Sequence, residues 1–204
     1  MAILTNLSFA DGFLFRTLLL SLAAFTQIGL GTGHAEAQEQ QSAPLELQVK
    51  AAILYNFAKF IEWPESELAS GTSMNFCVLG SQDFCDTLTQ MVRGKTINGR
   101  VPVARVIHGI PEIRNCHLLF IGAADKKRLQ ELISAAEASG VVTVSDLDQF
   151  ARHGGMIRLI KEANRVRFRI NVDAVNRSGL KISSKLLQLA EVVHESNLTN
   201  PKRP

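Results

Sequence analysis

The sequence predicts a single α/β domain with a mixed, largely parallel sheet, helices on both faces, and a C-terminal antiparallel hairpin plus helix. Two observations predict it. Strand-like and helix-like segments alternate from residue 74 to about residue 153, with glycines or capping residues between them. The last two strand-like segments are joined by a link that is short enough only for an antiparallel hairpin.

The first predicted element is a strongly apolar helix over Leu45–Trp63. Apolar residues recur at helical spacing in this segment: Val49, Ile53, Phe57, Phe60 and Ile61, with Leu54 and Ala58 widening the stripe. Pro64 ends the helix, because the residue before a proline is pushed out of the helical region. We therefore expect this helix to be buried on most sides.

The alternating region supplies the parallel part of the sheet. Strands are predicted at Met74–Leu79, Val101–Ile107, His117–Ile121 and Val141–Val144. Helices are predicted from Ser81 to about Val92, at Lys126–Ala138, and as a short helix capped by Ser145 or Asp146. Pro102 cannot donate to a strand ladder, so we expect its strand at a sheet edge.

The end of the domain changes character. Met156–Ile160 and Val166–Val172 are predicted as the hairpin, joined by residues 161–165. A final helix is predicted over Ser184–Val193, with an apolar face made of Leu186, Leu187, Leu189, Ala190 and Val193.

The N-terminal segment has the layout of a secretory signal peptide. Arg16 precedes an apolar run over residues 18–25, and residues 35–37 form a small-residue A-x-A cleavage site. The run is shorter than the roughly 20 residues of a membrane-spanning helix, although an uncleaved N-terminal anchor remains the alternative. We predict a signal peptide at 1–37, a polar leader at 38–44, one domain at 45–196 and a flexible tail at 197–204.

Charge and motifs argue against several function classes. The formal net charge of +3 is too mild and scattered to suggest nucleic-acid binding. The nucleophile-elbow, Walker, dinucleotide-binding and zinc-protease motifs are absent from the sequence. Cys116 and His117 are adjacent on a strand and so point to opposite faces, which does not make a metal site. We expect no cofactor, no metal and no catalysis, with an unrecognised hydrolase as the minority alternative.

A long segment in the first helix resembles the signature of the YfiR-like family, otherwise a family of unknown function. This segment is VKAAILYNFAKFIEWP, residues 49–64. Further matches are Asn75–Gly80, Gly94–Gly99, Cys116–Ile121, Gly154–Ile157, Arg167–Asn171 and Ser178–Leu187. Together they cover nearly the whole mature chain in order.

The resemblance implies a location and a partner. The best-understood family member is a periplasmic repressor that holds a membrane-bound diguanylate cyclase inactive by binding its periplasmic sensor domain. We accordingly expect a periplasmic chain with such a partner, soluble once mature, homodimeric, and acting in cyclic di-GMP signalling and biofilm regulation. The alternative is a periplasmic small-molecule-binding sensor module working with another membrane signalling protein.

The resemblance also bears on the three cysteines. The family commonly carries cysteines at the positions of Cys77 and Cys116, which in an oxidising compartment favours a disulfide between them. Pairing of Cys77 with Cys85 is the competing possibility, and three reduced, buried thiols are another. Cys85, if left over, would pair with another molecule or be buried.

Two sets of residues are candidates for the partner-binding surface. The first is Tyr55, Asn56, Lys59 and Trp63, and the second is Met156, Asn171, Lys181, Ser183 and Lys185. The alternatives are that Tyr55 and Trp63 belong to the core and that the charged residues form a solvated face. A ligand would sit beyond the strand ends, at Gly80-Ser81, Gly122-Ala123 and Ser145-Asp146, although these serines are more often plain helix caps.

Overall fold

The computed structural model describes residues 36–63, 73–163 and 165–195. The chain divides into two units, residues 1–41 and 42–204, and the described part of the first unit is the start of helix α2 (Glu36–Lys59). The second unit holds the sheets and the other helices. The predicted tail lies outside the described residues, as does nearly all of the predicted signal peptide.

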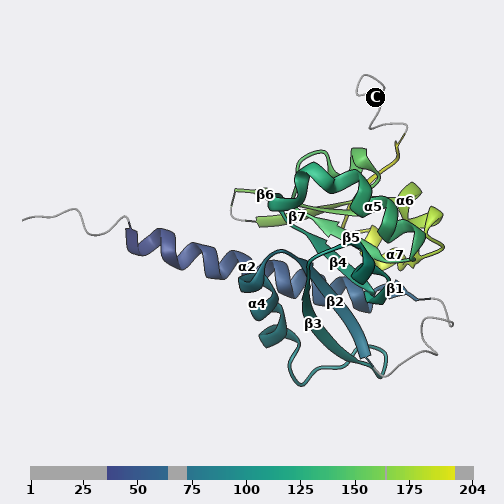
Figure 1. The fold of residues 1–204 in the computed structure, drawn as a ribbon. Helices are drawn as coiled ribbons and strands as arrows, with labels where there is room; N and C mark the ends of the chain where they lie inside the picture. Colours follow the sequence, from purple (N-terminus) through teal and green to yellow (C-terminus); the bar gives the residue numbers. More distant parts are fainter. Residues whose placement is uncertain (1–35, 64–72, 164, 196–204) are drawn as a thin grey trace, which may run out of the picture. The chain divides into compact units, whose positions relative to one another are not determined.

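The second unit is built on a seven-stranded sheet with the order β3-β2-β4-β5-β6-β7-β9 (Figure 1). The strands are β2 (Ser73–Leu79), β3 (Val101–Ile107), β4 (Leu118–Ile121), β5 (Val142–Ser145), β6 (Ile157–Glu162), β7 (Arg165–Asn171) and β9 (Glu191–Val193). Every neighbouring pair is parallel except the β6–β7 hairpin. The predicted fold class is therefore confirmed, and β3 with Pro102 forms one edge as expected.

Helices cover both faces of this sheet. One face packs against α2, α4 (Gln82–Val92) and α6 (Val172–Arg177), and its core includes Phe57, Phe84 and Ala174. The opposite face packs against α5 (Leu129–Ala138) and the 3-10 helices η1 (Ile110–Asn115) and η3 (Phe150–His153). Another 3-10 helix, η2 (Ala123–Arg128), leads into α5.

Helix α4 illustrates how local sequence sets these elements. The Ser81 hydroxyl caps the helix by accepting a hydrogen bond from the Phe84 amide at 3.4 Å. The helix then buries Phe84, Leu88 and Val92 on one face, as its apolar spacing predicts. Gly94 follows with a φ of +71°, a left-handed conformation that glycine adopts without steric cost.

The bounds of the first helix differ from the prediction at both ends. Helix α2 begins at Glu36 and runs through the predicted leader, where Ala, Glu and Gln are all good helix formers. It ends at Lys59, because Ile61–Glu62 form the short strand β1, which pairs with β8 (Lys181–Ile182) in a second sheet. Its buried stripe runs through Ala51, Leu54, Phe57 and Ala58, whereas Val49 is exposed.

Ser145 does not cap a helix. It is the last residue of β5, and its hydroxyl donates to the Ile121 carbonyl at 2.7 Å and accepts from the Leu147 amide at 3.1 Å. The short helix η3 begins later, after Gln149, which has a φ of +67°.

The predicted final helix is much shorter in the structure. Helix α7 covers only Ser184–Leu187, and residues 191–193 form β9, which pairs in parallel with β7. Val192 and Val193 are β-branched and favour a strand once the edge of β7 offers hydrogen bonds. Leu189, assigned to the apolar face, is 74% exposed. No helix within the described ranges is long and apolar enough to cross a membrane.

Candidate functional site

The pairing of β1 with β8 brings parts of the two predicted partner-binding sets close to each other. Ile61 faces Ile182 and Glu62 faces Lys181, and the Ser183 amide donates to the Phe60 carbonyl at 2.8 Å. The end of α2 therefore lies beside the segment 181–185, far away in sequence. We call the candidates that reach solvent here the α2–β8 surface: Tyr55, Asn56, Lys59, Lys181, Ser183 and Lys185.

This surface is rich in positive charge. Asn56, Lys59, Lys181 and Lys185 are exposed, while Tyr55 and Ser183 are half-buried. The ammonium groups of Lys59 and of Lys95 lie 5.3 Å and 4.8 Å from the centre of the Tyr55 ring. Cation–π contacts of this kind restrain the ring, and the Tyr55 hydroxyl donates to the Thr96 carbonyl at 3.5 Å.

Trp63, in contrast, belongs to the core. Its side chain is only 6% exposed, and its indole N–H donates to the Ala58 carbonyl at 3.3 Å. Its ring meets the His117 ring edge to face, with centroids 5.7 Å apart. The indole is satisfied internally, so direct contact with a partner is not available to it in this conformation.

Met156 and Asn171 are also buried rather than displayed. Asn171 is fully buried and caps α6, its side-chain oxygen accepting from the Ala174 amide at 3.2 Å. Its amide nitrogen donates to the Ala151 carbonyl at 3.2 Å and to a Glu195 carboxylate oxygen at 3.3 Å. Asn171 thus ties α6 to η3, and neither Met156 nor Asn171 is part of a surface.

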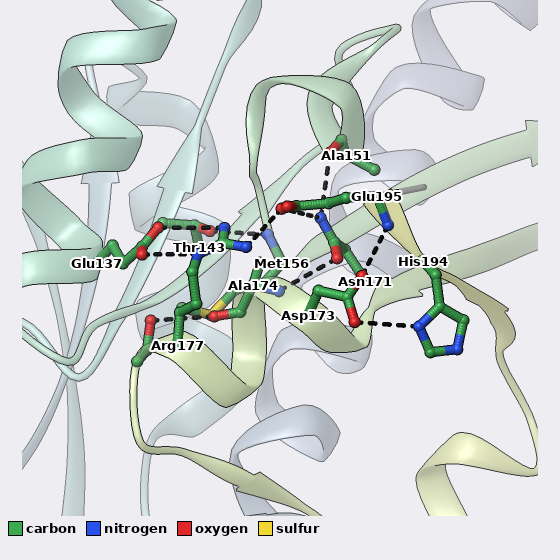
Figure 2. Close-up of polar contacts among 11 residues, drawn as sticks. Glu137, Thr143, Ala151, Met156, Asn171, Asp173, Ala174, Arg177, His194 and Glu195 are labelled. Carbon is green, nitrogen blue, oxygen red and sulfur yellow. Dashed lines mark hydrogen bonds and ion pairs between the residues drawn. The ribbon is translucent and has the colours of Figure 1, made fainter. Parts of the chain in front are cut away.

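A polar network that sequence reasoning missed surrounds Asn171 (Figure 2). Arg177 on α6 binds Glu137 at the end of α5 at 2.8 Å and Glu195 beyond β9 at 2.8 Å. The Glu137 hydrogen bond is the main cause that raises the pKa of Arg177 above its usual range. One guanidinium thus ties three distant segments together.

The same network fixes His194 and Glu195, the two residues that follow β9. Asp173 accepts from the Glu195 amide at 2.8 Å and contacts the His194 ring at 3.0 Å (Figure 2). These two contacts, the amide first, lower the pKa of the Asp173 carboxyl. The sequence offers only a weak signal of this network, because charged residues near a chain end usually form a solvated face.

A crevice opens at the carboxyl ends of β2, β4 and β5, where the sequence placed a ligand site. Its volume is about 240 Å³, and it includes parts of all three predicted strand-end pairs. We call it the strand-end crevice; it is lined by Leu47, Lys50, Leu79, Gly80, Ser81, Phe84, Phe120, Gly122, Ala123, Ala124 and Asp146. Sequence reasoning missed its α2 residues, Leu47 and Lys50.

Lys50 closes one side of the crevice with an ion-pair network. Its ammonium lies 2.7 Å from Asp146 and 2.7 Å from Glu46, which also pairs with Lys161 at 2.7 Å. Burial lowers the pKa of Lys50, but the hydrogen bonds that its ammonium donates to Asp146 and Glu46 outweigh burial and raise the pKa above its ordinary value. Hydrogen bonds from Lys161 and Lys50 lower the pKa of Glu46 to about 2. In the sequence, the signal that could have revealed this network is Lys50, a charged residue within the apolar stripe of the first helix.

A disulfide joins Cys77 on β2 to Cys116 just before β4, as the family resemblance implies. Both residues are buried in the core on the α5 face of the sheet. Cys85 is buried in the core on the other face and forms no disulfide with either of these described cysteines. Burial raises the pKa of the Cys85 thiol, which is typical of an inert structural cysteine. No metal-binding group of three or more His, Cys, Asp or Glu side chains occurs among the described residues.

A family model described as YfiR/HmsC-like matches residues 47–191. The chain belongs to the YfiR/HmsC-like family. The match includes the strand-end crevice, the disulfide and every residue of the α2–β8 surface.

Solved structures with partial similarity include a domain in complex with L-Trp, a substrate binding protein and a protein described only as conserved. The last, a conserved domain protein from Vibrio cholerae O1 biovar El Tor, has 10% identity and a TM-score of 0.47, covering 72% of this chain and 59% of that one. An ABC domain in complex with L-Trp from Streptococcus pneumoniae has 12% identity and a TM-score of 0.43, covering 59% and 56%. CD0873, a substrate binding protein with adhesive properties from Clostridium difficile, has 10% identity and a TM-score of 0.43, covering 61% and 55%. The YfiR/HmsC-like chain thus spans less than two thirds of each.

Proposed function

We propose that this chain is an exported, periplasmic regulatory protein that represses a membrane-bound diguanylate cyclase by contacting its periplasmic sensor domain. The observation that carries this proposal is the family match over residues 47–191. The buried Cys77–Cys116 disulfide supports an oxidising compartment, since such bonds persist outside the cytoplasm.

The α2–β8 surface is the proposed contact with the cyclase. Lys59, Lys181 and Lys185 are exposed on it, and a surface of this sign selects a partner that presents acidic side chains. Tyr55 is the proposed anchor, because it is partly buried and held in place by Lys59 and Lys95. In this proposal the chain acts through contact and catalyses no reaction.

Capture of membrane proteins by tagged mature protein tests this contact. Lys181→Glu combined with Lys185→Glu should weaken capture of the cyclase by at least about fivefold, a loss typical of interface residues that matter. The matched control is Lys126→Glu with Lys127→Glu, which makes the same charge change on the exposed helix η2. Equal capture by wild type and the first variant would contradict the assigned surface.

Two cellular measurements test location and output. Mass spectrometry of periplasmic protein should find an N-terminus near Gln38. Deletion of the gene should raise cyclic di-GMP, and only an exported form should restore the original level. Unchanged cyclic di-GMP on deletion would remove the cyclase as the partner, and an intact Met1 in the cytoplasm would remove the periplasmic role.

We also propose a homodimer. Leu45 and Val49 support it, because they lie one turn apart on α2 and are 60% and 37% exposed. Light scattering should give twice the chain mass for the wild type and the chain mass for Leu45→Glu with Val49→Glu. A monomeric wild type at micromolar concentration would contradict this proposal.

The strand-end crevice favours a second candidate function, a periplasmic small-molecule-binding sensor module that works with a membrane signalling protein. It lies where ligands bind in open α/β sheets, and its lining is apolar with a few polar groups. Binding of a metabolite to purified protein would support this candidate.

A further inference from the structure

The strand order creates a topological switch point between β2 and β4. The chain passes from β2 through α4 to β3, at the edge, and then returns across β2 to β4. Helix α4, which follows β2, packs on one face of the sheet, whereas η2 and α5, which follow β4, lead to the other. The two loops therefore diverge, and in open α/β sheets ligands bind in the crevice that such divergence opens.

The strand-end crevice lies at this switch point. Its floor and walls include Leu79 at the end of β2 with Gly80 after it, Phe120 in β4 with Gly122 after that strand, and Asp146 after β5. Its volume of about 240 Å³ is below the roughly 300–1,000 Å³ of pockets for drug-sized ligands. A ligand of this crevice must therefore be compact.

One wall of the crevice is apolar. Leu47 from α2 and Leu79 lie with the Phe84 and Phe120 rings, whose centroids are 4.6 Å apart. Burying an aliphatic group against such side chains is favourable because it removes apolar surface from water. The crevice thus favours a ligand with an apolar body.

The other wall presents a cation and an anion side by side. Lys50 and Asp146 are 2.7 Å apart, and the Lys50 side chain is only 13% exposed. With Glu46 and Lys161 they form a network of two acidic and two basic groups, which is neutral as a whole. A ligand with a net charge would leave one charge uncompensated in a partly buried place, at a high desolvation cost. A zwitterion would keep every charge compensated.

We propose that the strand-end crevice binds a small zwitterionic metabolite with an aliphatic body. Its carboxylate pairs with the Lys50 ammonium, its ammonium pairs with the Asp146 carboxylate, and its body packs on Leu47, Leu79 and Phe84. This inference rests on the second candidate function, the sensor module, and names the ligand class of that site.

Calorimetry with three matched probes tests the ligand class on the purified mature chain. L-leucine carries both charges, 4-methylpentanoate keeps only the carboxylate, and 3-methylbutylamine keeps only the ammonium group. L-leucine should bind at least about tenfold more tightly than either analogue, a difference of about 1.4 kcal/mol. Equal binding of an analogue, or absence of L-leucine binding at millimolar concentration, would overturn the proposal.

Two exposed positions on η2 locate the binding site. Ala124 lines the crevice, so Ala124→Trp should fill it and abolish L-leucine binding. Lys127 does not line it, so Lys127→Trp should bind as the wild type does. Asp146→Asn should reduce the preference for L-leucine over 4-methylpentanoate. Equal L-leucine binding by the Ala124→Trp variant would refute this location.

Capture of the membrane partner separates the ligand inference from the function on which it rests. If the chain binds L-leucine selectively but captures the same amount of partner at zero and at saturating L-leucine, the binding site is retained and the sensor role is rejected. If the chain does not bind L-leucine but its capture of the partner changes when metabolite extract is added, the sensor role is retained and the proposed zwitterionic ligand is rejected.

Discussion

Removal of the Cys77–Cys116 crosslink should lower the free energy of unfolding by about 4 kcal/mol. The bond closes a loop over a sequence separation of 39 residues. The loop-closure entropy for this length is about 13 cal/mol/K, which corresponds to about 4 kcal/mol at 25 °C. Cys77 is fully buried and Cys116 is 5% exposed, so replacing both with alanine adds a small loss of packing.

Urea denaturation followed by circular dichroism measures this difference. The Cys77→Ala/Cys116→Ala variant should unfold at much lower urea than the wild type, and dithiothreitol should have no effect on it. The same reductant should destabilise the wild type and the control variant Cys85→Ala, since Cys85 lies outside the disulfide. The reasoning would be refuted if the wild-type denaturation curve stayed unchanged in reductant, once a thiol titration had verified that the disulfide was reduced.

Three further outcomes follow from the structure. Trp63→Ala should cost roughly 3 to 5 kcal/mol in urea denaturation, since it empties a core site, and equal stability would return Trp63 to the surface candidates. Asn171→Ala should cost at least about 1 to 2 kcal/mol through loss of the α6 cap, and Asn171→Asp should also destabilise, because its buried carboxylate would keep the cap but face the Ala151 carbonyl and the Glu195 carboxylate to which the amide donates. The pKa of Glu46 falls from 4.5 to about 2 on folding, so its stabilisation is present above pH 4.5 and lost as pH drops toward 2. The melting-temperature difference between wild type and Glu46→Gln should shrink over that window, and a constant difference would contradict the ion pairing.

Elements with strong periodicity and clear boundaries could be predicted from the sequence. Helix α4 has a capping serine, an apolar face and a terminal glycine, and the structure keeps all three roles. The β6–β7 hairpin was predictable because its short link admits no other topology. Pro102 likewise predicted an edge strand from the chemistry of one residue.

The C-terminal region could not be predicted in the same way, because tertiary pairing overrides local pattern there. Residues 184–193 have helical apolar spacing, yet β9 forms because β7 offers an open parallel edge. The pair β1–β8 depends on contact between segments more than a hundred residues apart, which no local signal encodes. This pairing nevertheless joins two candidate sets that sequence reasoning had found separately, around Lys59 and around Lys181.

Helix α2 connects the strand-end crevice with the α2–β8 surface. Lys50 lines the crevice, and Lys59 lies nine residues later on the surface, about 14 Å along a helix that rises 1.5 Å per residue. Between them Leu54 and Phe57 are buried against the sheet, so a displacement of α2 at one site must be accommodated by close-packed side chains near the other. Coupling between two sites is reciprocal: if a crevice ligand changes affinity for the partner, the partner changes affinity for that ligand by the same factor. Measuring L-leucine affinity with and without the captured partner therefore tests the coupling from both directions, and equal affinities would mean that α2 carries two independent sites.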